Sequence, residues 1–120
     1  ESILEGVDNV YKDRRIISVF EPHRFSRVLS LQKEFAKSFV KSSLVLLCPI
    51  YAAGEKKNSK FNMFEFARLI SKLSKTQVIL IKEYKDLEKF FKKNLISNEI
   101  IIGMGAGTIS KYMRDLKTVL

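Results

Sequence analysis

Short apolar runs alternate with longer amphipathic segments along this chain. The apolar runs lie at 16–20, 44–48, 77–81 and 99–102. Runs of this length between polar residues predict short strands that are covered on both faces. Helical periodicity is found at 2–12, 28–41, 63–73, 84–93 and 108–116. Strands that alternate with helices predict an α/β fold, with a Rossmann-like parallel sheet of about four strands and helices on both faces.

The order of the predicted strands matters because it decides where a ligand can bind. A doubly wound order of 3-2-1-4 would make the first and fourth strands neighbours at a switch point. The loops after strands one, two and four would then lie along one edge of the sheet, where ligands of such folds bind. This places the loops that begin at Glu21, Pro49 and Gly103 close together.

Length and composition are those of one compact domain, residues 1–120. The chain has 120 residues, of which 46% are hydrophobic and 29% charged, so it can form a core and is not typical of a disordered segment. No apolar run approaches the roughly 18 residues of a membrane-spanning helix. The first residues lack the pattern of a signal peptide. Because the sequence starts without Met and within a predicted helix, we expect it to be a fragment of a longer protein.

The formal net charge of +9 has two interpretations. The lysines are scattered along the predicted helices, with one local concentration at Lys56, Lys57 and Lys60. This is typical of a solvated basic surface, although it would also attract a phosphorylated ligand. A nucleotide- or RNA-binding module is the alternative, but the predicted strands carry apolar runs in place of interleaved basic and aromatic residues.

The single cysteine and single histidine limit the possible chemistry. Cys48 lies in an apolar run, where a buried core thiol is expected. One Cys and one His cannot form a zinc site, and the chain can form no internal disulfide.

The most polar loop follows the first predicted strand. Pro22 has no N–H for a strand ladder, so the strand should end near Phe20 or Glu21. Arg24 and Arg27 could together bind a carboxylate or phosphate, or Arg27 could pair with a neighbouring helix. His23 could bind substrate or pack beside Pro22.

No nucleophilic triad is indicated, and we assign no catalytic residue. Two further segments carry weaker signals. Glu55 could act as a base, but a charged residue in a lysine-rich loop is more often solvated. The glycine-rich segment at 103–107 suits either a tight turn or an anion site at a helix N-terminus, and it matches neither G-x-G-x-x-G nor the phosphate loop G-x-x-x-x-G-K-[ST].

Three segments carry a resemblance to a known family. They are Val-Phe-Glu-Pro-His-Arg-Phe-Ser-Arg at 19–27, Ile-Tyr-Ala-Ala-Gly-Glu at 50–55 and Gly-Ala-Gly at 105–107. In this order and at this spacing they resemble the C-terminal domain of the Mur ligases. The alanine-adding members match best, and the murein-peptide recycling ligases are the alternative. The sequence departs from the family pattern at Glu21, Pro49 and Thr108, where Gln, Asp and Asn are common.

The resemblance implies a three-domain cytoplasmic ligase of peptidoglycan synthesis. Such an enzyme uses ATP and Mg²⁺ to form an acyl phosphate on UDP-N-acetylmuramate, which the amine of L-alanine then attacks. The central domain supplies the phosphate loop and most metal ligands, so this domain would be inactive alone, would bind no cofactor by itself, and would have no nucleic-acid or membrane partner. Arg24 and Arg27 would hold the alanine carboxylate with His23 beside them. The implied substrate-binding residues are His23, Arg24, Arg27, Tyr51, Ala106 and Gly107.

Overall fold

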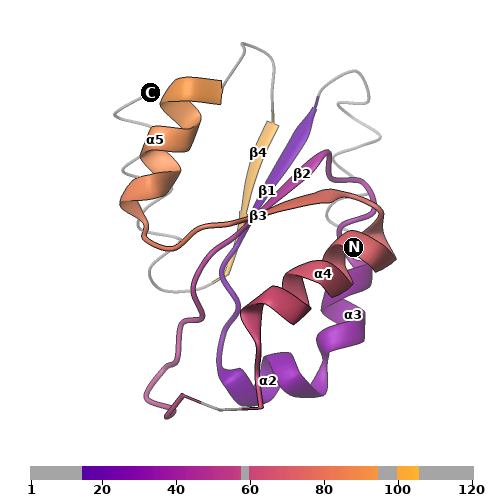
Figure 1. The fold of residues 1–120 in the computed structure, drawn as a ribbon, viewed down its shortest axis with the longest axis vertical. Helices are drawn as coiled ribbons and strands as arrows, with labels where there is room; N and C mark the ends of the chain where they lie inside the picture. Colours follow the sequence, from indigo (N-terminus) through magenta and orange to yellow (C-terminus); the bar gives the residue numbers. More distant parts are fainter. Residues whose placement is uncertain (1–14, 58–59, 95–99, 106–120) are drawn as a thin grey trace.

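The computed structural model describes residues 15–57, 60–94 and 100–105. Within these ranges, β1 (Ile16–Phe20), β2 (Leu44–Leu47), β3 (Gln77–Leu80) and β4 (Ile100–Met104) form one parallel sheet in the order β3-β2-β1-β4 (Figure 1). The predicted strand order is therefore confirmed. The predicted helices at 2–12 and 108–116 lie outside the described residues, as do Ala106 and Gly107.

The central strands are the most buried. Every residue of β1 and β2 is buried, whereas β3 is exposed or half-buried along its length. β1 pairs with β2 on one side and with β4 on the other, so that Ile17 lies opposite both Leu44 and Ile101. Side chains alternate between the two faces of a strand, and a strand covered on both faces must be apolar throughout, as these runs are.

Helices cover both faces of the sheet. α2 (Phe25–Ser30), α3 (Gln32–Lys37) and α4 (Met63–Ser74) lie on one face, and α5 (Lys85–Asn94) lies on the other (Figure 1). Each face has its own core. Phe20, Phe39 and Phe66 belong to the first, and Leu87 and Phe91 pack against the second. The prediction of helices on both faces is confirmed.

The single helix predicted at 28–41 is wrong. The chain forms two short helices that are separated at Leu31, and the second ends at Lys37. It ends early because the Ser74 hydroxyl donates to the Ala36 carbonyl and accepts the Phe39 N–H at 3.0 Å. A side chain from α4 thus takes the place of the next helical hydrogen bond.

Two boundaries near the ligand-binding edge also differ from prediction. α2 begins at Phe25, earlier than expected, because the Arg24 carbonyl already accepts the Val28 N–H at 3.2 Å. β4 continues to Met104, because Gly103 and Met104 still pair with β1. The glycine-rich turn therefore starts later than the sequence indicates. No helix within the described ranges has the length and apolar character needed to cross a membrane.

Candidate functional site

The loop after β1, residues 21–24 (the β1 loop), is held from both sides. The Glu21 N–H donates to the Met104 carbonyl of β4 at 2.9 Å. On the other side, the Tyr51 N–H donates to the Pro22 carbonyl and the Arg24 N–H donates to the Tyr51 carbonyl, both at 2.8 Å. The pairing of neighbouring strands thus continues into their loops. This brings together the three segments that were expected to share one edge.

His23 and Tyr51 lie face to face where these loops meet. Their rings are 5.3 Å apart between centroids, with planes inclined by 11°, and their backbones form an isolated parallel bridge. Tyr51 keeps 38% of its surface exposed. The pair therefore joins the β1 loop to the loop after β2, residues 48–57 (the β2 loop).

A cavity of about 490 Å³ lies at the carboxyl ends of β1 and β4. Its charged and polar lining includes Glu21, His23 and Arg27, and the end of β4 contributes Gly103 and Gly105. The apolar part of the lining consists of Phe20, Phe35, Phe39, Ile102 and Met104. The switch point of a doubly wound sheet is the expected position for such a cavity. His23, Arg27 and the glycine-rich segment are thus brought together, but Arg24 is not among the lining residues.

Arg27 has an aromatic support. Its guanidinium carbon lies 5.8 Å from the centroid of the Phe35 ring, within the range of a cation–π contact. No carboxylate among residues 15–57, 60–94 and 100–105 forms an ion pair with it, which disfavours the alternative that Arg27 pairs with a neighbouring helix. Its planar donors can therefore serve an anionic ligand in the cavity.

Arg24 has an unusual backbone conformation. Its φ of 68° and ψ of 134° lie in a region that residues with a Cβ rarely adopt. The side chain is exposed, and the residue stands where the chain turns from the β1 loop into α2. Such strained residues persist where the surrounding structure holds them, as the hydrogen bonds with Tyr51 and Val28 do here.

Glu55 is in contact with solvent, as expected, but it also contacts the start of α2. Its carboxylate accepts the Ser26 hydroxyl at 2.6 Å and the Ser26 N–H at 3.2 Å. These two hydrogen bonds, with smaller contributions from the Phe25 backbone and the charge of Arg24, lower the pKa of Glu55. No local sequence signal indicates this contact, because Ser26 and Glu55 are 29 positions apart.

Glu21 is the buried acid of the site. It is 1% exposed, and its carboxylate accepts the hydroxyl of Tyr84, which precedes α5. Burial, and then this hydrogen bond, raise the pKa of Tyr84. Burial, and then the charge of Glu21, raise the pKa of Cys48 to about 12. Cys48 is therefore a protonated core thiol, as expected.

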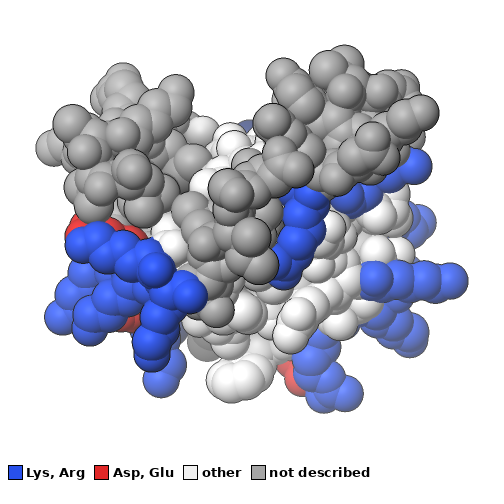
Figure 2. Space-filling view, turned by 90° about the horizontal axis from the view of Figure 1, so that it is seen from above, with Lys and Arg blue, Asp and Glu red and all other residues white. Residues whose placement is uncertain are grey.

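The described basic side chains lie in separate groups on one end of the molecule. Figure 2, seen from the top of Figure 1, shows these Lys and Arg groups, some with Asp or Glu beside them. Ion pairs join Arg68 to Glu65, Lys85 to Glu83, and Lys92 to Glu88. This distribution is typical of a solvated surface, which was the first interpretation of the charge.

Comparison with known proteins identifies relatives of one kind. No family model matches the chain. It is 44% identical to the UDP-N-acetylmuramate–L-alanine ligase of Pelagibacter ubique over 118 residues, which cover 98% of this chain and 25% of that protein. It is 38% identical to the ligase of the same name from Prochlorococcus marinus, with 86% of this chain and 21% of that protein covered. The chain thus spans about a quarter of the length of these relatives.

A solved structure supports the fold independently. The murein peptide ligase of Psychrobacter arcticus superposes with a TM-score of 0.71, over 98% of this chain and 24% of that chain. At 16% identity this likeness concerns the fold alone. The sequence identity, which extends over nearly the whole of this chain and about a quarter of each UDP-N-acetylmuramate–L-alanine ligase, shows that the chain belongs to the Mur ligase family.

Proposed function

We propose that this chain is the C-terminal, amino-acid-binding domain of a three-domain ligase. The complete enzyme would join L-alanine to UDP-N-acetylmuramate in the cytoplasm, through an acyl phosphate formed with ATP, as a step of peptidoglycan synthesis. The names of the curated relatives support this activity. By itself the chain would not catalyse ligation.

The observation that carries the proposal is the position of Arg27 in the cavity between the ends of β1 and β4. A guanidinium can hold a carboxylate through two parallel hydrogen bonds. His23 lines the same cavity and offers a further donor. The cavity of about 490 Å³ is larger than L-alanine needs, which leaves room for the reacting carboxyl end of the second substrate. Arg27 would thus hold the carboxylate while the amine points toward that second substrate.

ATP and Mg²⁺ do not fit the residues of this chain that the structure describes. The sequence has no phosphate loop of the G-x-x-x-x-G-K-[ST] type. Across residues 15–57, 60–94 and 100–105, no three His, Cys, Asp or Glu side chains form a group that could hold a metal ion. In our proposal the nucleotide phosphates and the metal are held elsewhere in the complete ligase. The role of this chain would be to bind and orient the amino acid.

The two alternatives have less support. The likeness to a murein peptide ligase concerns the fold alone, whereas the sequence relatives are alanine ligases. An RNA-binding module would bind generic RNA with a strong dependence on salt. The separate basic groups on the face seen in Figure 2 and the apolar strands do not favour that behaviour.

The proposal is tested by replacing Arg27 with Ala in the full-length ligase. Loss of a charge-assisted contact of about 2–3 kcal/mol should lower kcat/KM for L-alanine by roughly 10²-fold. Arg68→Ala is the matched control, because Arg68 is an exposed arginine on α4 outside the cavity. Unchanged alanine kinetics in the Arg27→Ala enzyme would contradict the assignment of this residue.

A further inference from the structure

Glu55 touches the arginine-bearing segment without lining the cavity. It reaches Ser26 from the β2 loop, and Ser26 directly precedes Arg27. We propose that Glu55 is a positioning residue that sets the place of Arg27 at the cavity by holding the start of α2. This inference rests on the proposed function, since it assigns Arg27 to the amino-acid carboxylate.

α2 needs a hydrogen-bond acceptor from another segment because its own residues do little to stabilise its N-terminus. The helix has six residues, its N-cap residue Arg24 makes no side-chain capping bond, and its first turn carries no acidic residue. A helix this short is marginal on its own, and its first N–H groups have no partner within it. The Glu55 carboxylate accepts one of these N–H groups and places a negative charge at the positive end of the helix.

The contact between Glu55 and Ser26 can affect the cavity because Ser26 directly precedes Arg27 in α2. Ser26 donates hydrogen bonds to Glu55 from both its backbone N–H and its hydroxyl, so the position and the orientation of Ser26 are both restrained. Arg27 follows on the same turn and extends over the Phe35 ring into the cavity lining. A shift of Ser26 would therefore move the guanidinium relative to a bound carboxylate.

The β2 loop is shaped to present Glu55. Ala53 and Gly54 have positive φ values of 52° and 87°, and the Glu55 N–H closes the turn on the Ala52 carbonyl at 3.0 Å. A Cβ at Gly54 would meet no atom within 4 Å, so only its backbone conformation favours glycine. The β2 loop is thus fastened to the β1 loop through Tyr51 and to α2 through Glu55.

A role as general base is disfavoured for Glu55. The hydrogen bonds from Ser26 and the charge of Arg24 lower its pKa, whereas a base for reactions near neutral pH needs a raised one. Its absence from the residues that line the cavity agrees with action through Ser26 and Arg27.

The test uses the full-length ligase and a set of matched variants. Glu55→Ala should raise KM for L-alanine about 10-fold or more, because small misplacements of a binding group have large kinetic effects. KM for ATP should not change. Glu55→Gln retains one acceptor for Ser26 and should have a smaller effect. Ser26→Ala removes the hydroxyl but keeps the backbone N–H that donates to Glu55, so it should raise KM for L-alanine less than Glu55→Ala does. Ser26→Thr should retain alanine use, and the double variant should be no worse than the stronger single variant.

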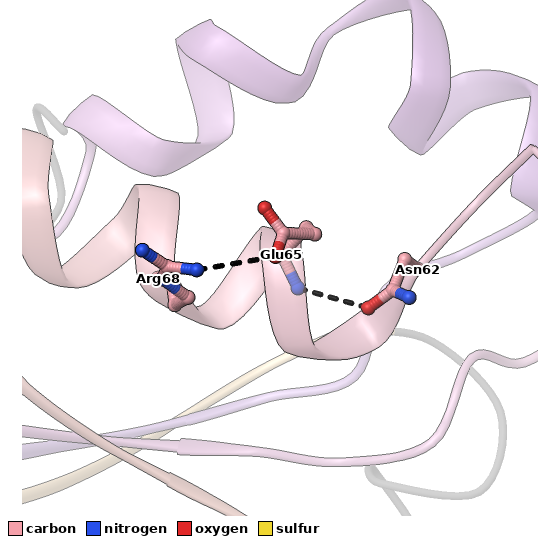
Figure 3. A network of polar contacts seen from close by, with 3 residues as sticks. All are labelled: Asn62, Glu65 and Arg68. Atoms are coloured by element: carbon pink, nitrogen blue, oxygen red, sulfur yellow. Dashed lines mark hydrogen bonds and ion pairs between the residues drawn. The ribbon is translucent and has the colours of Figure 1, made fainter.

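Glu65→Ala is the matched control. Glu65 is also an exposed glutamate near the start of a helix, but its carboxylate pairs with Arg68 on α4 (Figure 3), and it is not among the residues that line the cavity. Suppose that Arg27→Ala raises KM for L-alanine but Glu55→Ala leaves it at the value of the unmodified enzyme. This result would overturn the positioning role of Glu55 and leave the proposed function standing. If neither variant changes alanine use, the assignment of Arg27 to the amino-acid carboxylate fails and the positioning role of Glu55 fails with it.

A measurement without ligand separates the contact from the catalysis. Hydrogen exchange of the Ser26 amide should become faster in Glu55→Ala, because its acceptor is removed. The Glu65 amide, which donates to Asn62, should exchange as before. Unchanged exchange at Ser26 would show that Glu55 does not hold this helix, and would also overturn the proposal.

Discussion

The starts of α2 and α4 are stabilised in different ways. At α4, the Asn62 side chain accepts the Glu65 N–H at 3.0 Å, three residues further along the chain (Figure 3). At α2, the N-cap residue Arg24 makes no such bond, and Glu55 supplies the acceptor from the β2 loop. One helix thus begins with a local cap, and the other depends on a residue 29 positions away.

This difference distinguishes α4, which stabilises the fold, from α2, which carries a residue of the candidate site. A local cap stabilises its helix whatever the neighbouring loops do. A cap from another loop fixes the position of one loop relative to the other, and here both loops carry residues of the cavity or its rim. We therefore expect changes at α4 to alter stability, and changes at the start of α2 to alter the binding of the amino acid.

The largest effect is expected from Phe66→Ala in α4. Phe66 is 1% exposed and packs in the first core with Phe20 and Phe61. Removing a buried ring should lower the free energy of unfolding by about 3–5 kcal/mol. Urea unfolding measures this loss. A change below about 1 kcal/mol would mean that α4 does not carry the core as described.

Asn62→Ala should show the role of the local cap. Loss of the bond to the Glu65 N–H should lower the free energy of unfolding by about 0.5–2 kcal/mol, and Asn62→Ser should retain most of it. KM for L-alanine should stay the same in the full-length ligase. If it rose as in Glu55→Ala, the two helix starts would not differ in the way proposed.

The pH dependence of the α2 cap follows from the lowered pKa of Glu55. A carboxyl whose pKa is lower in the folded protein adds stability above the pKa of the unfolded chain, and this contribution is lost as pH falls through the folded pKa. The Ser26 amide resonance should therefore titrate with a midpoint below the usual value of about 4.3. Ser26→Ala should move the Glu55 pKa upward, because the Ser26 hydroxyl is the main cause of the shift. A midpoint at or above the usual value would contradict the contact.

The smallest effect is expected from Arg68→Ala. Its ion pair with Glu65 spans 3.4 Å, and the two side chains are 78% and 67% exposed. Such pairs contribute about 0–1 kcal/mol, and here we expect less than about 0.5 kcal/mol in thermal unfolding. A larger loss would indicate that the start of α4 also depends on its side-chain charges.

Much of the fold follows from patterns within single segments. The four apolar runs predicted the strands, the alternation with helices predicted the parallel sheet, and the switch point predicted the edge at which His23, Arg27 and the glycine-rich segment meet. The N-cap of α4, Asn62, can also be recognised in the sequence, because its contact with the Glu65 N–H is local.

The features that sequence reasoning missed depend on contacts between distant segments. The helix expected at 28–41 is broken and shortened, and the Ser74 hydroxyl from α4 binds at its end. Glu21 is buried, and its carboxylate accepts a hydrogen bond from Tyr84, which packs against the core on the α5 side of the sheet. Glu55 contacts Ser26 because β1 and β2 are neighbours. Contacts between such distant residues can be predicted only once the strand order and register are known.

The central claim is that the amino-acid carboxylate lies against Arg27 at the carboxyl ends of β1 and β4. The most direct test is a crystal structure of the full-length ligase with L-alanine and a non-hydrolysable ATP analogue. We predict the carboxylate oxygens at about 3 Å from the Arg27 guanidinium, with the Glu55–Ser26 hydrogen bonds in place. L-Alanine bound outside this cavity, with Arg27 turned away from it, would contradict the account.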